Sequence, residues 1–169
     1  MLSRVTEHTA LIRVQSWTRS DRAIPREAAN ALRIDWPLQA GEVASGRAEV
    51  ICINPTDWLV VAGIELPEEE LLQILAAAFH GTPFRATALS SSLARVRIEG
   101  NHARALLSKA CALDTQSADL TPSRAPRTLV AGLPAIIRCL HGPKFECIVP
   151  LSYADYLVAW LNDAAAEFR

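Results

Sequence analysis

The chain has 169 residues, a formal net charge of −1 and 21% charged residues, so it lacks the basic excess that is typical of nucleic-acid-binding proteins. Its length suits one compact domain or two small units. Half of the residues are hydrophobic and the mean hydropathy is +0.15, which favours a chain whose apolar surface is covered by partners, although a well-filled core would give the same value.

The ends of the chain and its cysteines indicate where the protein works. The N-terminal segment has no uninterrupted apolar run of the kind found in signal peptides, and we find no stretch of the length that a membrane span needs. Four cysteines are too few to form a disulfide scaffold in a chain of this size. We therefore expect a cytoplasmic protein with reduced thiols.

The first third of the chain predicts one strand and one short helix. Residues 9–17 are typical of a strand. A short helix should follow, with Pro25 in its first turn, because proline is tolerated there. Its apolar face consists of Ala28, Ala29, Leu32 and Ile34. Residues 37–47 contain Pro37, Gly41 and Gly46, and we expect a loop.

The next segment predicts a hairpin and a helix. Residues 48–53 and 57–63 are two β-rich runs separated by Asn54 and Pro55, a turn dipeptide. Pro67 and the three acidic residues after it should begin a helix, because both favour a helix N-terminus. The apolar face of this helix is made of Leu71, Leu75, Ala78 and Phe79.

The second half of the chain predicts the same kinds of element. Residues 86–100 should contain at least one strand, and Asn101 is a candidate N-cap for a helix over residues 101–113. A polar connection over residues 114–126 precedes three strand-like runs that end near residue 150. Ser152 should cap the last helix, whose apolar stripe consists of Tyr153, Leu157, Trp160, Leu161, Ala164 and Phe168.

The two halves have the same plan. Each has a hairpin with a proline in its turn, followed by an amphipathic helix. We therefore predict an α+β fold, made as a single domain over residues 1–169 from two similar units, about 1–88 and 89–169, each with helices packed on an antiparallel sheet.

The histidines and cysteines do not suggest a metal site. The four histidines, none of which has a partner at i, i+4 spacing, are His8, His80, His102 and His141. Cys139 and Cys147 flank a tight turn, and with His141 they are compatible with a zinc or redox trio; two small apolar side chains on a half-buried sheet explain them better. We predict no metal ligand in this chain.

Phosphate-binding motifs are also incomplete. The string GEVASG at residues 41–46 has the outer glycine spacing of a phosphate loop. Arg47 and Ala48 follow it, where that loop requires Lys and then Ser or Thr, so neither the phosphate charge nor the magnesium hydroxyl is supplied. With no GxGxxG string either, we predict no cofactor-binding residue.

Catalytic side chains are not indicated. Ser90, Ser91 and Ser92 lack the flanking glycines of a nucleophile elbow, and we expect a polar bend between strands. The candidate carboxylates are Asp57, Asp114, Asp119 and Asp155, and each more readily caps or solvates a turn or helix end. We predict no catalytic residue.

Large aromatic residues usually lie in a core or an interface. Trp58 begins a strand and Trp160 lies on the apolar face of the last helix. In a subunit of a larger assembly, Tyr156, Trp160 and Phe168 are the candidate interface anchors, and for Trp160 alone core packing is the better interpretation.

Several blocks of the sequence, in order, resemble a known family. They are INPTDWLVVAG, LARVRIEGNHARALLSKACALD, RTLVAGLPAIIR and FECIVPLSYADYLVAWL, at residues 53–63, 93–114, 127–138 and 145–161. Together they are similar to the gamma subunit of heterotetrameric sarcosine oxidase. Residues 1–47 match only in general character. The ALSSSLA string lacks the acidic residue that family members often carry before the strand of the second block, which argues against residual folate chemistry but leaves the fold unchanged.

The resemblance implies an accessory role. Such complexes demethylate sarcosine oxidatively to glycine, and the one-carbon unit passes to tetrahydrofolate or leaves as formaldehyde. The resemblance further implies that FAD, FMN and NAD belong to the alpha and beta subunits and zinc to the delta subunit, so that this chain carries no cofactor and has those subunits as partners. The implied fold is similar to that of the glycine-cleavage T-protein, a folate-binding aminomethyltransferase.

Two other functions remain open. A free-standing folate-binding protein of the aminomethyltransferase type would need a carboxylate near the folate and the third domain of those enzymes, for which 169 residues are too few. A non-enzymatic interaction module of an unrelated complex is the other alternative. No feature predicts binding to nucleic acid or to a membrane.

Overall fold

The structure, a computed structural model, describes residues 2–4, 9–17, 26–116 and 120–168. Contacts between Cα atoms divide the chain into two compact units. We call Glu7–Ser90 the first unit, and Met1–Thr6 together with Ser91–Arg169 the second unit. In the described residues, every helix is too short or too polar to span a bilayer.

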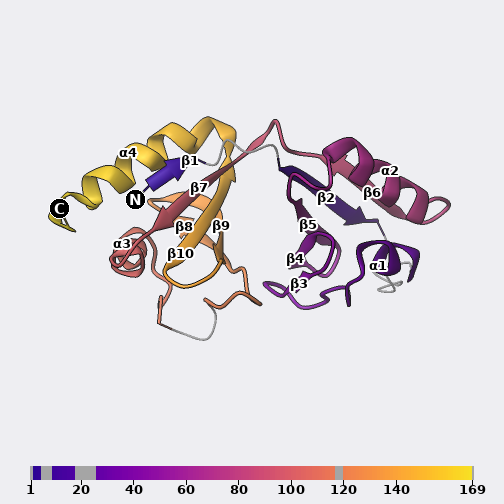
Figure 1. The fold of residues 1–169 in the computed structure, drawn as a ribbon, viewed down its shortest axis with the longest axis horizontal. Helices are drawn as coiled ribbons and strands as arrows, with labels where there is room; N and C mark the ends of the chain where they lie inside the picture. Colours follow the sequence, from indigo (N-terminus) through magenta and orange to yellow (C-terminus); the bar gives the residue numbers. More distant parts are fainter. Residues whose placement is uncertain (1, 5–8, 18–25, 117–119, 169) are drawn as a thin grey trace. The chain divides into compact units, whose positions relative to one another are not determined.

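The first unit is a five-stranded antiparallel sheet with two helices (Figure 1). Its strand order is β3-β4-β5-β2-β6. The elements are β2 (Ala10–Ser16), α1 (Arg26–Leu32), β3 (Val43–Ser45), β4 (Glu49–Asn54), β5 (Asp57–Ala62), α2 (Glu68–Ala78) and β6 (Phe84–Ala88). Alternate residues of β2 and β5, such as Ile12 and Val60, form a buried core with Leu71 and Leu75 of α2, so one face of the sheet is covered by helices.

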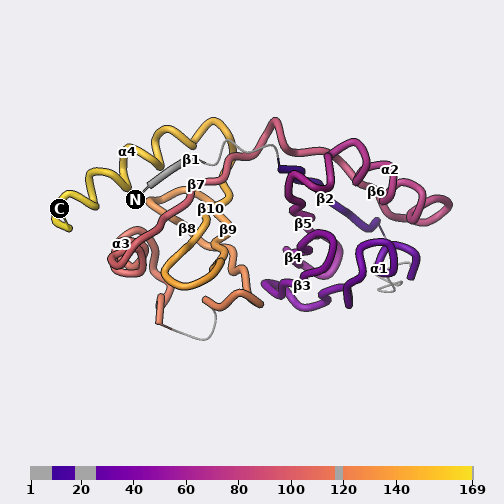
Figure 2. Tube along the Cα trace, in the orientation of Figure 1, coloured from indigo at the N-terminus to yellow at the C-terminus, as the bar shows by residue number. Residues whose placement is uncertain are grey.

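The second unit has a five-stranded antiparallel sheet in the order β1-β7-β10-β9-β8. The elements are β1 (Leu2–Arg4), β7 (Leu93–Glu99), α3 (Ala103–Ala110), β8 (Arg127–Val130), β9 (Leu133–Cys139), β10 (Lys144–Pro150), the 3₁₀ turn η1 (Leu151–Tyr153), α4 (Ala154–Ala164) and the 3₁₀ turn η2 (Ala166–Phe168). Within this unit α4 lies along β7 and α3 (Figure 2). Its core alternates in the same way, with Val96 and Phe145 packed against Leu107 and Leu157.

The two units have the same topology. In chain order, β2-α1-β3-β4-β5-α2-β6 of the first unit corresponds to β7-α3-β8-β9-β10-α4 of the second, and each sheet has the same order of corresponding strands. Without β3 or β8, this is the βαββαβ arrangement of ferredoxin-like folds. The one exception is the strand at the edge beyond β2 or β7: in the first unit it is β6, which follows α2, and in the second it is β1, which comes from the start of the chain.

Most predicted elements are confirmed, with two differences and two further points. The strand β1 (Leu2–Arg4) pairs with β7 of the second unit and not with a strand from the first half of the sequence. A short edge strand, β3, lies inside the segment expected to be a loop, because it pairs with β4. Residues 84–99 form two strands, β6 and β7, one in each unit. Pro25, expected in the first turn of α1, lies outside the described residues.

The predicted helix caps are wrong. Neither Asn101 nor Ser152 occupies the N-cap, because α3 begins one residue later, after His102, and the 3₁₀ turn η1 precedes α4, which begins after Tyr153. Neither N-cap side chain makes a capping hydrogen bond. Tyr153, expected in the apolar stripe of the last helix, is exposed, and the buried residues of α4 are Ala154, Leu157 and Leu161.

Candidate functional site

The histidines that the structure describes lie at separate places. His80 follows α2 in the first unit, His102 precedes α3 in the second, and His141 lies in the turn between β9 and β10. His8 is outside the described residues. Across the described part of the chain, no group of three or more His, Cys, Asp or Glu side chains is placed to hold a metal ion.

Cys139 and Cys147 are not opposite each other in their hairpin. Cys139 pairs with Phe145, and Cys147 pairs with Ile137. Cys147 is fully buried in the core of the second unit, and Cys139 packs against that core. Burial raises the pKa of the Cys147 thiol to about 12. Because the thiolate is the form that binds metals and attacks electrophiles, a thiol that stays protonated at neutral pH acts here as a small apolar side chain.

Cys52 and Cys111 are in similar surroundings. Burial is the main cause that raises the pKa of Cys52 to about 11, and it also raises the pKa of Cys111. All four cysteines are free thiols. Their environments are those of packed, unreactive cysteines.

The glycine spacing of GEVASG serves the packing of the first unit. The string contains β3, which pairs with β4, and it ends at Gly46, whose amide donates a hydrogen bond to the carbonyl of Ala48. A Cβ atom added at Gly46 would lie 2.4 Å from the carbonyl oxygen of Leu32 and 2.6 Å from that of Arg33. Glycine is therefore required for the close approach of two backbone segments.

Asp57 does not cap or solvate a turn, as we expected it to do, but forms a partly buried ion pair. The Nε and Nη2 atoms of Arg13 donate to its two carboxylate oxygens at 2.9 and 2.5 Å. The bidentate hydrogen bond to Asp57 raises the pKa of Arg13 above its ordinary value, which burial opposes. Asp57 is buried, whereas the side chain of Arg13 is 45% exposed. The pair fixes β5 to the neighbouring strand β2.

The other candidate carboxylates and serines have local roles. Asp114 accepts the amide hydrogen of Gln116 at 2.9 Å, as an Asx turn does. Ser90 donates to the carboxylate of Glu68 and accepts the amide hydrogen of Leu11, so the serine run forms the expected polar turn. Asp155 is exposed in the first turn of α4, and Asp119 lies outside the described residues.

A buried ionic cluster in the second unit was not predicted. Glu146 is fully buried on β10; Nε of Arg95 donates to its Oε2 at 3.0 Å and Nη1 of Arg138 to its Oε1 at 2.7 Å. Nη2 of Arg97 lies 3.6 Å from the same carboxylate. The signal in the sequence was the single Glu146 in the otherwise apolar run at residues 145–150, but its partners are fixed only by the register of three strands.

Glu146 and Asp57 occupy equivalent positions. In the first unit Arg13 is opposite Leu59 and Asp57 is two residues before Leu59 on β5. In the second unit Arg95 is opposite Ile148 and Glu146 is two residues before Ile148 on β10. Each sheet thus carries one diagonal acid–arginine pair on the face that its helices leave uncovered.

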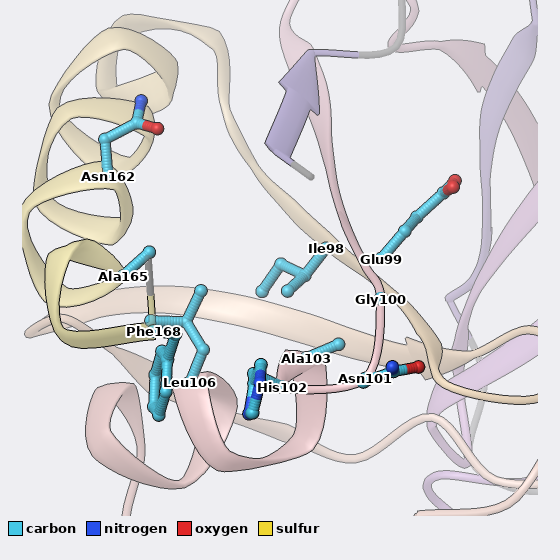
Figure 3. A pocket seen from close by; sticks show the side chains of 10 residues that line it. All are labelled: Ile98, Glu99, Gly100, Asn101, His102, Ala103, Leu106, Asn162, Ala165 and Phe168. Atoms are coloured by element: carbon cyan, nitrogen blue, oxygen red, sulfur yellow. The ribbon is translucent and has the colours of Figure 1, made fainter.

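A groove of about 300 Å³ lies at the start of α3 in the second unit (Figure 3). Its floor is apolar, with Ile98, Leu106 and Ala165 among the lining residues. The rings of His102 and Phe168 stack at 4.9 Å between centroids with an 8° angle between planes. The side chain of Glu99 points away from this ring pair in Figure 3. The groove has the lining of a site for an apolar side chain and brings no acid–base pair together.

The predicted interface anchors differ in exposure. Tyr156 is 52% exposed, and its hydroxyl lies 3.5 Å from the carbonyl oxygen of Ala131. Trp160 and Phe168 are partly buried against the core of the second unit. Leu151 and Tyr153, just before α4, are also exposed. We call Leu151, Tyr153 and Tyr156 the α4 patch; sequence reasoning found only its last member.

The comparisons with known proteins agree with this fold. The model of the family "Sarcosine oxidase, gamma subunit family" matches residues 18–167. The sarcosine oxidase subunit gamma of Corynebacterium sp. (strain U-96) is 30% identical over 155 residues, which are 87% of this chain and 74% of that protein.

Two solved structures are similar to this one. A chain of the heterotetrameric sarcosine oxidase from Corynebacterium sp. U-96, in complex with pyrrole 2-carboxylate, superposes with a TM-score of 0.87 at 25% identity, covering 99% of this chain and 84% of that one. Glycine cleavage system aminomethyltransferase T from Bartonella henselae gives a TM-score of 0.66 at 14% identity, covering 99% of this chain and 45% of that one, which confirms the fold.

The family match begins about 35 residues before the first of the sequence blocks on which the resemblance rested. It spans both units, and the similarity of fold covers nearly the whole chain. The chain therefore belongs to the sarcosine oxidase gamma subunit family.

Proposed function

We propose that this chain is the gamma subunit of a heterotetrameric sarcosine oxidase and contributes no reacting group to it. The complex would demethylate sarcosine oxidatively to glycine and transfer the one-carbon unit to tetrahydrofolate. The observation that carries the proposal is the family match over residues 18–167, joined to the TM-score of 0.87 with a chain of such an enzyme. The complex would work in the cytoplasm, which subcellular fractionation tests.

The cofactors belong, in this proposal, to other subunits. FAD, FMN and NAD lie in the alpha and beta subunits, and zinc lies in the delta subunit. The arrangement of the donor groups supports this division, because the described histidines are far apart in the sequence and the thiols are held protonated by burial. Metal and flavin analysis of the purified chain, alone and in the complex, tests it.

The α4 patch is the proposed contact with a partner subunit. The patch exposes three large side chains within six residues, those of Leu151, Tyr153 and Tyr156. Tyrosine is enriched in protein interfaces because its ring is apolar and its hydroxyl finds a hydrogen-bond partner. Trp160 and Phe168 are partly buried against the core of the second unit, so Tyr156 is the proposed anchor of the patch.

Co-purification tests the proposal. The tagged chain, co-expressed with alpha, beta and delta candidates from its own genome, should purify with them as one complex. Tyr156→Ala should weaken the complex by about 1–2 kcal/mol, as truncating an interface aromatic does. Asp163→Asn, at an exposed residue elsewhere on α4, is the matched control and should leave it unchanged. A chain that never co-purifies with these subunits excludes the proposed function.

The fold leaves a second candidate, a free-standing folate-binding protein. Its support is the similarity of fold to the glycine-cleavage aminomethyltransferase, of which this chain covers 45%. Calorimetry with tetrahydrofolate on the isolated chain distinguishes the two functions. Micromolar binding would favour this candidate, and the gamma-subunit proposal expects no measurable heat of binding.

A further inference from the structure

Four strands stand at the edges of the two sheets, β3 and β6 in the first unit and β1 and β8 in the second. An edge strand offers its outward N–H and C=O groups to any other strand, and proteins commonly limit this by keeping edge strands very short. β1 and β3 have three residues each and β8 has four, whereas β6 has five, with the sequence FRATA. In the described part of the chain, β6 is therefore the longest edge strand, and it contains neither proline nor lysine.

Two hydrogen bonds show which backbone groups of β6 point outward. The amide of Trp17 donates to the carbonyl of Pro83 at 3.0 Å, and the amide of Leu89 donates to the carbonyl of Leu11 at 2.7 Å, just beyond the two ends of the β2–β6 pairing. Because hydrogen-bonded and non-hydrogen-bonded pairs alternate in an antiparallel ladder, the second and fourth residues of β6 also bond inward to β2. The other three residues turn their N–H and C=O groups away from the sheet; they are Phe84, Ala86 and Ala88.

The outward edge of β6 is open and apolar on one side. Its outward backbone groups have no hydrogen-bond partner among the described residues. Phe84 and Ala86 pack against the core of the first unit on the side that α2 covers, but they and Ala88 are only partly buried. A further strand at the usual spacing of about 4.8 Å would pair with all three residues and cover their side chains.

The other side of this edge is basic. β2 and β6 carry two arginines, Arg13 and Arg85, and no acidic residue. Arg13 is paired with Asp57, whereas Arg85 is exposed and has no ionic partner in the described part of the chain. A second copy of β6, paired antiparallel with Ala86 opposite Ala86, would bring its own arginine diagonally next to Arg85, and like charges oppose such a pairing. A strand that carries an acidic residue suits this edge better.

We propose that β6 is a docking edge for an extended segment of a partner subunit, which adds to the sheet of the first unit as a sixth strand. The backbone of that segment would pair with the outward N–H and C=O groups of β6. Its alternate side chains would be apolar on the α2 side and acidic beside Arg85. The inference rests on the proposed function, since it requires the partner subunits, and it concerns a site in the first unit, whereas the α4 patch belongs to the second.

Proline at the centre of β6 tests the backbone pairing. The amide of Ala86 points outward, so Ala86→Pro removes a group that the sheet of the first unit does not use. Affinity of the tagged chain for the alpha, beta and delta subunits should fall about tenfold, because one hydrogen bond is lost and the ring blocks the added strand. The matched control is Ser45→Pro on the opposite edge strand β3, where Ser45 is exposed and the amide of the next residue, Gly46, bonds inward to Ala48; affinity should change less than about twofold.

Charge reversal tests the acidic residue of the partner segment. Arg85→Glu should weaken binding about threefold or more at low salt, and the difference from the wild type should shrink as salt is added. The matched control is Arg26→Glu, at an exposed arginine of α1 in the same unit, which should change affinity less than about twofold. Equal losses in the two variants would mean that net charge and not a local contact is responsible, and would overturn the acidic part of the inference.

Hydrogen exchange of the wild type decides the matter even if Ala86→Pro fails to fold. The outward amides of β6 should exchange more slowly in the complex than in the chain alone, because a paired strand protects them. Wild-type binding without this added protection overturns the inference and leaves the proposed function intact, as does full binding by a folded Ala86→Pro variant or an equal loss in Ser45→Pro. A wild-type chain that binds none of the subunits overturns the proposed function and this inference together.

Discussion

Arg13 and Asp57 in the first unit stand at the same register positions as Arg95 and Glu146 in the second. In the first unit the Arg13 side chain is 45% exposed and pairs with one carboxylate, that of Asp57. In the second unit the arginine and the carboxylate are buried, and Arg138 joins them. The comparison teaches that the shared topology sets where an acid–arginine pair can form, whereas neighbouring residues decide whether it is a solvated pair or a buried network.

The largest loss of stability is expected for Glu146→Gln, which tests the buried network of the second unit. The change would leave two buried guanidinium groups without a counter-charge, and removal of one partner from a buried ion pair costs about 3–5 kcal/mol in the free energy of unfolding. Urea denaturation followed by circular dichroism measures the loss. A loss below about 1 kcal/mol would mean that water reaches the cluster and that the two pairs are alike.

The packing of the first unit is tested by Gly46→Ala. The added methyl group would lie 2.4 Å from the carbonyl oxygen of Leu32, so α1 or the segment before β4 must shift. We expect a loss of about 2 kcal/mol, as overpacking typically produces. Gly63→Ala is the matched control in the same unit, because no atom lies within 4 Å of its added Cβ, and it should be close to neutral. Equal stability of the two variants would show that the contact at Gly46 is easily relieved.

Asp57→Asn tests the more exposed of the two acid–arginine pairs. Because the Arg13 side chain is 45% exposed, its guanidinium can turn to water when the carboxylate is lost. The expected loss is about 1–2 kcal/mol, smaller than for Glu146→Gln. The same denaturation experiment measures both variants, and the interpretation fails if Asp57→Asn is the more damaging of the two.

The smallest effect is expected at the C-terminal end of the second unit, where η2 packs on α3. Lys109 donates to the carbonyl of Ala164 at 3.2 Å, pairs with Glu167 at 2.8 Å and lies 5.3 Å from the ring centroid of Phe168. Both ionic side chains are substantially exposed, so Lys109→Met should cost about 0.5–1 kcal/mol. Ser108→Ala, one residue earlier, is the control and should be nearly neutral. Thermal unfolding compares the two variants. If both had the same Tm, the contacts of Lys109 with η2 would not stabilise the unit.

Local signals predicted the elements well. Pro67 and the acids after it do precede α2, and the Asn54-Pro55 pair does lie at the hairpin turn, because such signals act within a few residues. The predicted N-caps, Asn101 and Ser152, were wrong because each N-cap lies one residue later, and the residue there makes no capping hydrogen bond with its side chain. The edge strand β3 was missed because three residues carry too little periodicity.

The ionic features of the sheets could not be predicted in the same way. Arg95 and Glu146 are 51 residues apart, and only the antiparallel register of β7 and β10 brings them together. Asp57 was placed beside a turn correctly, but its burial depends on Arg13, 44 residues away. Charge on one face of a sheet becomes visible only when strand order is known, so the cluster of Glu146, Arg95 and Arg138 had no signature in composition.

The edge strand β1 has a consequence for biosynthesis. Leu2 pairs with Ile98, so β1 leaves the ribosome before β7, the strand with which it pairs. At about 5–20 residues per second, the delay is roughly five to twenty seconds. During that time all strands of the first unit can emerge and pair, whereas β1 stays unpaired and exposed to chaperones until β7 emerges.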